Sequence, residues 1–183
     1  MGIFDLLFVC TGNICRSPTA HLLAASRLPA EHFRVHSAGT HGLTGYPVEP
    51  KAARLLAKSG IGCDEFRATR LDAGLVGDAD LVLTATRDHR TAVVTLAPDA
   101  LRKTFTMREF ARLLEPVPDP PEGEPVERAR ALVAGAAAQR NQVWAPPADD
   151  DVADPYGSNA AAYERAYRDI TEALDGPLRR LAG

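Results

Sequence analysis

The sequence is poor in several residue types and patterns that mark special classes of protein. Only three of its 21 basic residues are lysine, and it contains one tryptophan, two methionines and three cysteines. No stretch approaches the roughly 20 apolar residues of a membrane-spanning helix, and no basic segment precedes the first apolar residues. We therefore expect a cytoplasmic protein without a spanning helix, a secretory signal or a membrane partner.

The charge balance and the few cysteines exclude further classes. With 21 basic and 24 acidic residues the net charge is -3, which disfavours nucleic acid as a partner and requires any anion site to be local. Cys10, Cys15 and Cys63 cannot all pair, and a chain of 183 residues needs no disulfide to hold a core. We therefore expect the thiols to be reduced. The histidines and cysteines also lack the spacing of metal ligands, so we expect no metal and no cofactor.

Short apolar runs alternate with segments of helical periodicity along the chain. Strands are predicted at Ile3 to Val9, Phe33 to His36, Asp80 to Thr84 and Lys103 to Thr106. Helices are predicted from Ser17-Pro18 onward, at Pro50 to Ser59, at Arg87 to Leu96, up to Leu114, at Val126 to Gln139 and at Ala160 to Leu181. This order predicts one α/β domain over residues 1–183, with a parallel sheet covered by helices on both faces.

One segment departs from this alternation. Between Glu115 and Asp151 the composition changes to PVPDPPEGEP, an alanine-rich stretch and APPADDD. Long connections of this kind are uncommon in small domains. We interpret residues 115–151 as an insertion rich in proline and alanine.

The turn after the first predicted strand carries the chemistry. Cys10 and Arg16 are separated by five residues, and a helix begins immediately afterwards. Backbone N–H groups in such a turn, together with the helix N-terminus, form a concavity for a tetrahedral anion, and the planar guanidinium of Arg16 is suited to hold two of its oxygens. Thiols in such positive surroundings are ionised at neutral pH, so we expect a Cys10 thiolate that faces the phosphorus of a bound phosphate. The alternative is a buried packing cysteine and an arginine that caps a surface turn.

Other residues of the turn have physical uses of their own. Gly12 allows close backbone approach, and Asn13 tolerates a left-handed conformation. The Ser17 hydroxyl is able to cap the helix or to hydrogen-bond the thiolate. No Gly-Lys-Ser/Thr is present, so the turn is not a nucleotide-binding Walker loop.

The strings VCTGNICRSP, SAGT at Ser37 to Thr40, and DPYG at Asp154 to Gly157 resemble motifs of the bacterial low-molecular-weight protein tyrosine phosphatases. The resemblance implies a three-layer fold with a four-stranded parallel sheet between helices. It implies Cys10 as nucleophile, Arg16 as phosphate clamp and Asp154 as the acid that protonates the leaving group. The remaining residues that it places against the substrate are Thr11, Gly12, Asn13, Ile14, Cys15, Ser17 and Tyr156.

The chemistry of the acid supports Asp154 separately. A positioned acid accelerates departure of a phenolate by about 10²–10⁴-fold. Pro155 makes the loop rigid, and Tyr156 offers a ring either for substrate contact or for plain packing. Asp149, Asp150 and Asp151 are the other acids of this segment.

Several residues keep two interpretations or depart from the family pattern. Cys15 resembles the family's second cysteine, and this resemblance implies that it can form a disulfide with oxidised Cys10. The alternative is that Cys15 is a buried thiol with a packing role. Gly157 stands where vertebrate relatives carry an aromatic residue. Phe66 replaces a histidine that braces the loop asparagine in many relatives, so Asn13 needs other support.

Three alternative functions remain beside phosphotyrosine hydrolysis. Arsenate reductases carry two further cysteines in the segment equivalent to Leu81 to His89, which has none. Protein arginine phosphatases typically have threonine where Ile14 stands, and a non-catalytic phosphotyrosine-binding module would not need the candidate acid. The resemblance implies a phosphotyrosine protein as substrate and a bacterial tyrosine kinase of polysaccharide assembly as a partner.

Overall fold

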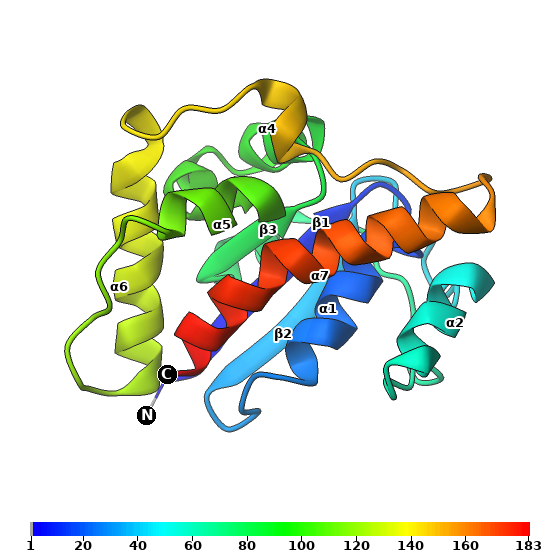
Figure 1. The fold of residues 1–183 in the computed structure, drawn as a ribbon, viewed down its shortest axis with the longest axis horizontal. Helices are drawn as coiled ribbons and strands as arrows, with labels where there is room; N and C mark the ends of the chain where they lie inside the picture. Colours follow the sequence, from blue (N-terminus) through cyan, green and yellow to red (C-terminus); the bar gives the residue numbers. More distant parts are fainter. Residues whose placement is uncertain (1) are drawn as a thin grey trace.

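The computed structural model describes residues 2–183 and contains one parallel four-stranded sheet (Figure 1). The strand order is β2-β1-β3-β4. The strands are β1 (Phe4–Cys10), β2 (Phe33–Gly39), β3 (Leu81–Thr84) and β4 (Thr104–Thr106). The helices are α1 (Arg16–Ala25), α2 (Pro50–Lys58), α3 (Ala73–Asp78), α4 (Arg87–Leu96), α5 (Met107–Leu114), α6 (Pro125–Ala138) and α7 (Ala160–Ala182), joined by 3-10 turns at Pro98–Lys103, Gln139–Asn141 and Pro147–Asp150.

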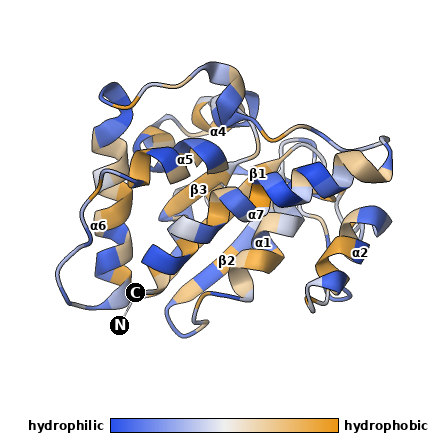
Figure 2. Ribbon diagram, viewed as in Figure 1, coloured by the Kyte–Doolittle hydropathy of each residue, from blue (hydrophilic) through white to orange (hydrophobic). Residues whose placement is uncertain are grey.

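Strand β1 is buried on both faces because its side chains alternate between two cores. Phe4, Leu6 and Phe8 enter a large core that includes residues of α1, α2, α5, α6 and α7. Leu7 and Val9 enter a smaller core with residues of α3 and α4. The apolar stripes of these helices face the sheet while their polar sides face outward (Figure 2). The expected three-layer α/β architecture is confirmed.

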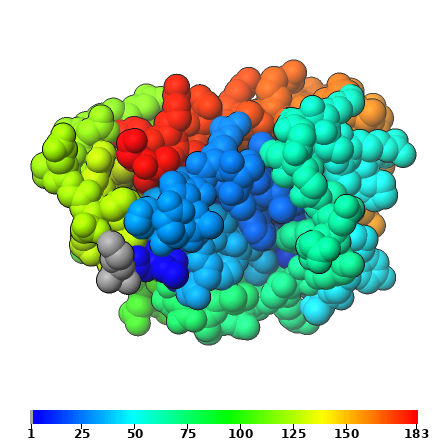
Figure 3. Space-filling model, turned by 90° about the horizontal axis from the view of Figure 1, so that it is seen from below, coloured from blue at the N-terminus to red at the C-terminus, as the bar shows by residue number. Residues whose placement is uncertain are grey.

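The C-terminal helix α7 runs beside α1 along one edge of the molecule (Figure 3). Its side chains Tyr163, Ala166, Ile170 and Leu174 are buried in the large core. Helix α6 also buries one face there, through Val126, Ala129, Leu132, Val133 and Ala136. Residues 115–151 therefore supply part of the core, and their interpretation as an insertion stays a prediction, as does the single domain over residues 1–183.

The predicted elements are present with small differences in their bounds. Strand β2 continues to Gly39, beyond the predicted end at His36, because Ser37, Ala38 and Gly39 pair with the last residues of β1. Helix α3 was not predicted, since its six residues AGLVGD contain two glycines. Within residues 2–183 no helix is both long and apolar enough to cross a membrane.

Of the two uses expected for the Ser17 hydroxyl, capping of the helix is not the one found. Helix α1 already begins at Arg16, and its N-cap residue, Cys15, makes no side-chain capping hydrogen bond. The Ser17 hydroxyl points away from the helix end and meets Cys10 and Asn13 instead. This is the second of the two uses expected for Ser17.

Candidate active site

The loop between β1 and α1 forms a cradle of unused backbone donors at the carboxyl end of the central strand. Its carbonyl groups are turned outward, where those of Cys10, Thr11, Gly12 and Ile14 accept hydrogen bonds of 2.8–3.0 Å from the N–H groups of Thr40, His41, Leu43 and Glu49. Within the described chain, no N–H group of residues 11–15 donates a hydrogen bond to another residue. A run of free N–H groups ahead of a helix N-terminus is suited to a tetrahedral oxyanion.

The backbone of residues 39–43 can follow the loop this closely because Gly39 has no side chain. A Cβ atom at Gly39 would collide with the carbonyl oxygen of Thr11 and approach the nitrogen of Asn13 to 3.0 Å. Any other residue would push the two segments apart. The glycine of the SAGT string is therefore needed for the fold. It allows the chain at the end of β2 to come close enough to hydrogen-bond the loop between β1 and α1.

The Cys10 sulfur lies at the base of the cradle and is buried. Its Sγ atom is 2.9 Å from the Ser17 Oγ atom. Asn13 Nδ2 donates a 2.8 Å hydrogen bond to the same oxygen. The Ser17 hydroxyl thus lies between the Cys10 sulfur and the Asn13 amide, and it also donates to the Ala38 carbonyl at 3.5 Å.

Asn13 holds the loop in its curved shape. It is fully buried and adopts a φ angle of 56°, in the left-handed region that asparagine tolerates better than most residues. Its amide also donates to Ser37 Oγ at 2.9 Å and accepts from the Thr69 N–H at 2.7 Å. Ser37 and Thr69 thus give Asn13 the support that Phe66 cannot give, since the Phe66 ring packs against His21 instead.

Arg16 links the cradle to the chain that follows the 3-10 turn at Pro147–Asp150. Its buried guanidinium donates to the Val152 carbonyl at 3.1 Å and to Asp154 Oδ2 at 2.7 Å. The Asp154 side chain is about half exposed, at 49%, and its other oxygen accepts from the Tyr156 N–H at 3.1 Å. The candidate acid is therefore held beside the cradle by the arginine of the cradle.

A cavity of about 340 Å³ opens above Cys10. Its lining is formed by Cys10, Thr11, Gly12, Ile14, Cys15, Arg16, His41, Leu43, Asp154 and Tyr156. The structure thus brings together eight of the ten predicted site residues, while Asn13 and Ser17 lie buried behind the loop. His41 and Leu43 were missed by the sequence analysis, although the nearby glycines Gly39 and Gly42 indicated a tight turn.

The walls of this cavity suit a planar apolar group attached to an anion. Ile14, Leu43 and Tyr156 line its sides, and the last two are well exposed, at 40% and 63%. The sulfur of Cys10 and the guanidinium of Arg16 lie deeper. A ring between the apolar side chains would present its phosphate to the free N–H groups.

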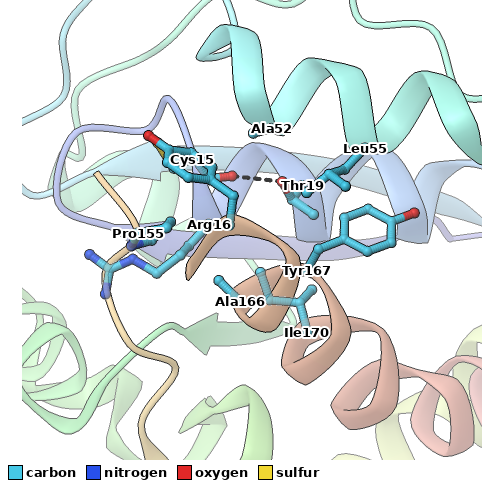
Figure 4. Close-up of a pocket in the computed structure, with 10 residues that line it drawn as sticks. Cys15, Arg16, Thr19, Ala52, Leu55, Pro155, Ala166, Tyr167 and Ile170 are labelled. Carbon is cyan, nitrogen blue, oxygen red and sulfur yellow. Dashed lines mark hydrogen bonds between the residues drawn. The ribbon is translucent and has the colours of Figure 1, made fainter. Parts of the chain in front are cut away.

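Cys15 lies in the wall between this cavity and a smaller void beneath α2 and α7 (Figure 4). The void holds only about 10 Å³, roughly the space of one water molecule. Burial raises the pKa of the Cys15 thiol to about 12. Its Sγ atom donates weakly to the Tyr163 hydroxyl, 3.9 Å away.

His89 supports the loop from the opposite side, a role that the sequence analysis did not assign. Its Nε2 atom lies 2.8 Å from Thr11 Oγ1, and its Nδ1 atom lies 2.7 Å from Thr86 Oγ1. Burial and the charge of Arg16 lower the pKa of His89 to about 4. The imidazole is therefore neutral at neutral pH. No local pattern reveals this role, because the contact depends on β1 and β3 being neighbours.

Residues 2–183 contain no group of three or more histidine, cysteine or acidic side chains that could hold a metal ion. The arrangement offers instead a buried sulfur nucleophile, an arginine, a ring of backbone donors and a carboxyl group at one opening. Such a set can transfer a phosphoryl group through the sulfur. Cys63, the third cysteine, belongs to a loop after α2 and does not line the cavity.

Comparisons with known proteins agree with this site. Residues 5–142 match the family model for low molecular weight phosphotyrosine protein phosphatases. The chain is 34% identical to the low molecular weight protein-tyrosine-phosphatase Etp of Escherichia coli K12. The matched 141 residues make up 77% of this chain and 92% of the relative. It is 36% identical over 172 residues to the protein-arginine-phosphatase of Geobacillus stearothermophilus, which covers 93% of this chain and 90% of the relative.

Solved structures show the same fold. The YwlE arginine phosphatase from Geobacillus stearothermophilus superimposes with a TM-score of 0.72 and 27% identity, over 97% of this chain and 92% of the other. The family model and the Etp match each cover more than half of this chain. The resemblance stated from the motifs is confirmed: the chain belongs to the low molecular weight phosphotyrosine protein phosphatases, a family of phosphoric monoester hydrolases.

Proposed function

We propose that this protein hydrolyses phosphotyrosine in proteins through a phosphocysteine intermediate. The observation that carries the proposal is the meeting of Cys10, Arg16 and Asp154 around one cavity of about 340 Å³. Asp154 comes from a segment 138 residues away from Arg16 in the sequence. Its place beside the cradle is what an acid needs in order to reach a leaving oxygen.

In the first step the Cys10 thiolate attacks phosphorus, and the bond from phosphorus to the phenol oxygen breaks. Arg16 and the free N–H groups of the loop stabilise the charge on the three equatorial oxygens. Asp154 gives its proton to the departing phenolate. A bound phosphate would compete with Asp154 for the Arg16 guanidinium, which frees the carboxyl group to turn toward the leaving oxygen.

In the second step a water molecule attacks phosphorus, and the bond from phosphorus to sulfur breaks. Asp154, now a carboxylate, accepts a proton from the water. Inorganic phosphate leaves, and the Cys10 sulfur, 2.9 Å from Ser17 Oγ, is free for the next turnover. The Ile14 and Tyr156 side chains hold the tyrosine ring during the first step. A reduced nucleophile is required throughout, which supports a cytoplasmic location.

The experiment is an assay with p-nitrophenyl phosphate and a phosphotyrosine peptide in the presence of EDTA. Wild-type protein should turn over both substrates at rates that chelation does not change. Cys10→Ser should abolish turnover, because a hydroxyl is far less ionised than this thiol, while Cys63→Ser should keep the wild-type rate. A Cys10→Ser protein that retains about a tenth of the rate would move the nucleophile elsewhere.

The similarity to the Geobacillus arginine phosphatase supports a second candidate substrate, phosphoarginine. The apolar Ile14 side chain in the cavity wall favours an aromatic ring over a charged guanidinium. The ratio of kcat/KM for a phosphotyrosine peptide and for a phosphoarginine peptide decides between them. We expect the wild type to prefer phosphotyrosine and Ile14→Thr to shift the ratio toward phosphoarginine. A wild type that prefers phosphoarginine, with an Ile14→Thr protein that prefers phosphotyrosine, would refute our assignment.

A tyrosine kinase of polysaccharide assembly remains the proposed protein partner, and it rests on the resemblance alone. The matched relatives are described as protein-tyrosine-phosphatases. Incubation of such a phosphorylated kinase from the same organism with this protein should remove its phosphotyrosine. Retention of the label while p-nitrophenyl phosphate is hydrolysed would exclude this partner.

A further inference from the structure

Four arginines surround a second cavity, of about 220 Å³, between α4, α5 and the chain that follows α6. In Figure 1 this chain, drawn in gold, leaves α6 and passes α5. We name the group the arginine cluster; it consists of Arg87, Arg90, Arg112 and Arg140. Among residues 2–183 two carboxylates, Glu109 and Asp150, line the same cavity. This leaves a local excess of two positive charges in a protein whose net charge is -3.

The two carboxylates do not use all the donors of the cluster. Arg90 and Arg112 each donate one hydrogen bond, to Glu109 at 2.6 Å and to Asp150 at 2.5 Å. Arg87 approaches Asp150 only to 3.9 Å and makes no side-chain hydrogen bond within residues 2–183. The Nε atom of Arg112 is buried and has no hydrogen-bond partner in that part of the chain. A buried charged donor without an acceptor, such as Arg112 Nε, is costly. The Arg87 side chain is 39% exposed, so its donors are accessible to a ligand. Both arginines are therefore suited to an anionic ligand.

The cluster is held in a fixed geometry. Arg140 donates to the carbonyl groups of Leu101 and Thr104, and its guanidinium lies 4.1 Å from the centre of the Phe105 ring. Glu109 is anchored as well, because it accepts the Thr106 N–H in the capping box at the start of α5. A rigid base of this kind lowers the entropic cost of ligand binding.

An exposed aromatic residue forms the rim of the cavity. Trp144 is the only tryptophan of the chain and is 82% exposed. Planar rings stack on such side chains, and arginine binds phosphate through paired hydrogen bonds. A pocket that encloses a whole drug-sized ligand holds about 300–1,000 Å³. This cavity, of about 220 Å³, is smaller but has room for a phosphate group. A ring attached to that phosphate would lie outside the cavity, against Trp144.

We propose that the arginine cluster and Trp144 form a second ligand site, separate from the Cys10 cradle, for a phosphate monoester carried on a planar ring. A nucleoside monophosphate and a phosphorylated aromatic side chain share this chemistry. The doubly charged phosphate matches the excess of two positive charges. The site does not depend on the catalytic roles proposed above.

The arginine cluster contacts the segment of the chain that leads to Asp154, so ligand binding there can affect the position of Asp154. Asp150 is paired with Arg112, and the next residue, Asp151, accepts the backbone N–H of Arg87 at 2.8 Å. The following residue, Val152, accepts from Arg16. A phosphate that competes with Asp150 for Arg87 and Arg112 would therefore loosen the segment that carries Asp154.

Because Trp144 is the only tryptophan, its fluorescence reports on this site. The protein is titrated with AMP, with phenylphosphonate and with inorganic phosphate, in the presence of just enough vanadate to abolish turnover at the Cys10 cradle. The arginine cluster then stays accessible to the probes. AMP or phenylphosphonate should change the emission saturably, and the tighter of the two identifies the source of the phosphate. Arg87→Gln should weaken this binding by about tenfold or more, as expected for a hydrogen bond between charged groups.

The matched control is Arg179→Gln, since this exposed arginine pairs with Asp175 on the surface of α7, away from the arginine cluster. It should leave the affinity unchanged. Isothermal titration calorimetry repeats each measurement without the fluorophore. Binding of inorganic phosphate as tight as that of both ring-bearing probes would refute the role of Trp144. Absence of both heat and fluorescence change, or equal affinity in Arg87→Gln, would overturn the site.

Discussion

Arg16 donates a 2.7 Å hydrogen bond to Asp154, and this bond joins the cradle to the chain that follows the 3-10 turn at Pro147–Asp150. The same guanidinium has two possible acceptors in our proposal, the carboxylate of Asp154 and the phosphate of a substrate. Arg16 is buried, whereas Asp154 is about half exposed. In our proposal the substrate phosphate displaces the more exposed of the two partners, so that Asp154 turns from Arg16 toward the leaving oxygen.

The first prediction concerns the role of Asp154 as the acid. Asp154→Asn should slow phosphotyrosine hydrolysis by about 10²–10⁴-fold, because the amide has no proton to give to the phenolate. The loss should shrink for aryl phosphates with more acidic phenols, which leave without protonation. Plots of log kcat against leaving-group pKa should therefore be steeper for the mutant than for the wild type.

Asp149→Asn is the matched control, since this exposed residue belongs to the same acidic run but does not line the cavity. Its plot should coincide with that of the wild type. Vanadate should bind Asp154→Asn at least as tightly as it binds the wild type, because Arg16 loses a competing acceptor. Equal slopes in Asp154→Asn and the wild type would transfer the acid role to another residue.

The second prediction concerns oxidation. Peroxide should convert the Cys10 thiolate to a sulfenic acid, which then condenses with the Cys15 thiol to a disulfide and water. Both sulfurs border the same cavity. Because burial raises the pKa of Cys15 to about 12, the second step should accelerate as the pH is raised. Peptide mapping by mass spectrometry measures the disulfide.

Activity lost to mild peroxide should return with dithiothreitol in the wild type and in Cys63→Ser. In Cys15→Ser the loss should become irreversible, since Cys10 continues to the sulfinic acid. Irreversible loss in the wild type, with no Cys10–Cys15 peptide, would leave Cys15 as a packing residue.

The third prediction concerns Asn13. Asn13→Ala removes three side-chain hydrogen bonds and places a Cβ-bearing residue without a compensating amide at a φ of 56°. The free energy of unfolding should fall by about 3 kcal/mol or more. Urea unfolding measures the change, and Asn141→Ala, at an exposed 3-10 turn, should leave stability nearly unchanged.

Asn13→Gly separates the two causes, because glycine loses the same hydrogen bonds but accepts the positive φ. It should be about 1 kcal/mol more stable than Asn13→Ala. A combined loss below about 0.5 kcal/mol in Asn13→Ala would show that Ser37 and Thr69 hold the loop without this amide.

The fourth prediction concerns the stability of the fold in acid. Burial lowers the pKa of both His21 and His89 from 6.5 to about 4. Between these values the unfolded chain binds more protons than the native protein, so stability rises with pH. The contribution of the neutral histidines is complete above about pH 6.5 and is lost progressively toward pH 4.

Urea unfolding at several pH values checks this dependence. His89→Asn should reduce the slope of unfolding free energy against pH by up to one proton, which is about 1.4 kcal/mol per pH unit. Asn141→Ala, which removes no titratable group, should keep the wild-type slope. An unchanged slope in His89→Asn would mean that His89 is protonated in the native protein.

Much of the cradle was predictable because its parts are adjacent in the sequence. The seven residues from Cys10 to Arg16 supply the nucleophile, the arginine and the backbone donors, and the apolar run before them predicts a buried strand. The strands and most helices were found for the same reason, since periodicity is a local property. The Ser17 hydroxyl does not cap the helix, because its partners, Cys10 and Asn13, lie across the turn rather than along the helix.

The sequence by itself therefore determined the order of strands and helices, the loop from Cys10 to Arg16 and, through its motifs, the family. Only the tertiary structure decided which distant groups complete the site. The order β2-β1-β3-β4 brings the ends of neighbouring strands to one edge, where His89 meets Thr11 and Arg16 meets Asp154. The physical reason is that these hydrogen bonds join segments 78 and 138 residues apart, and their geometry depends on how the helices cover the sheet.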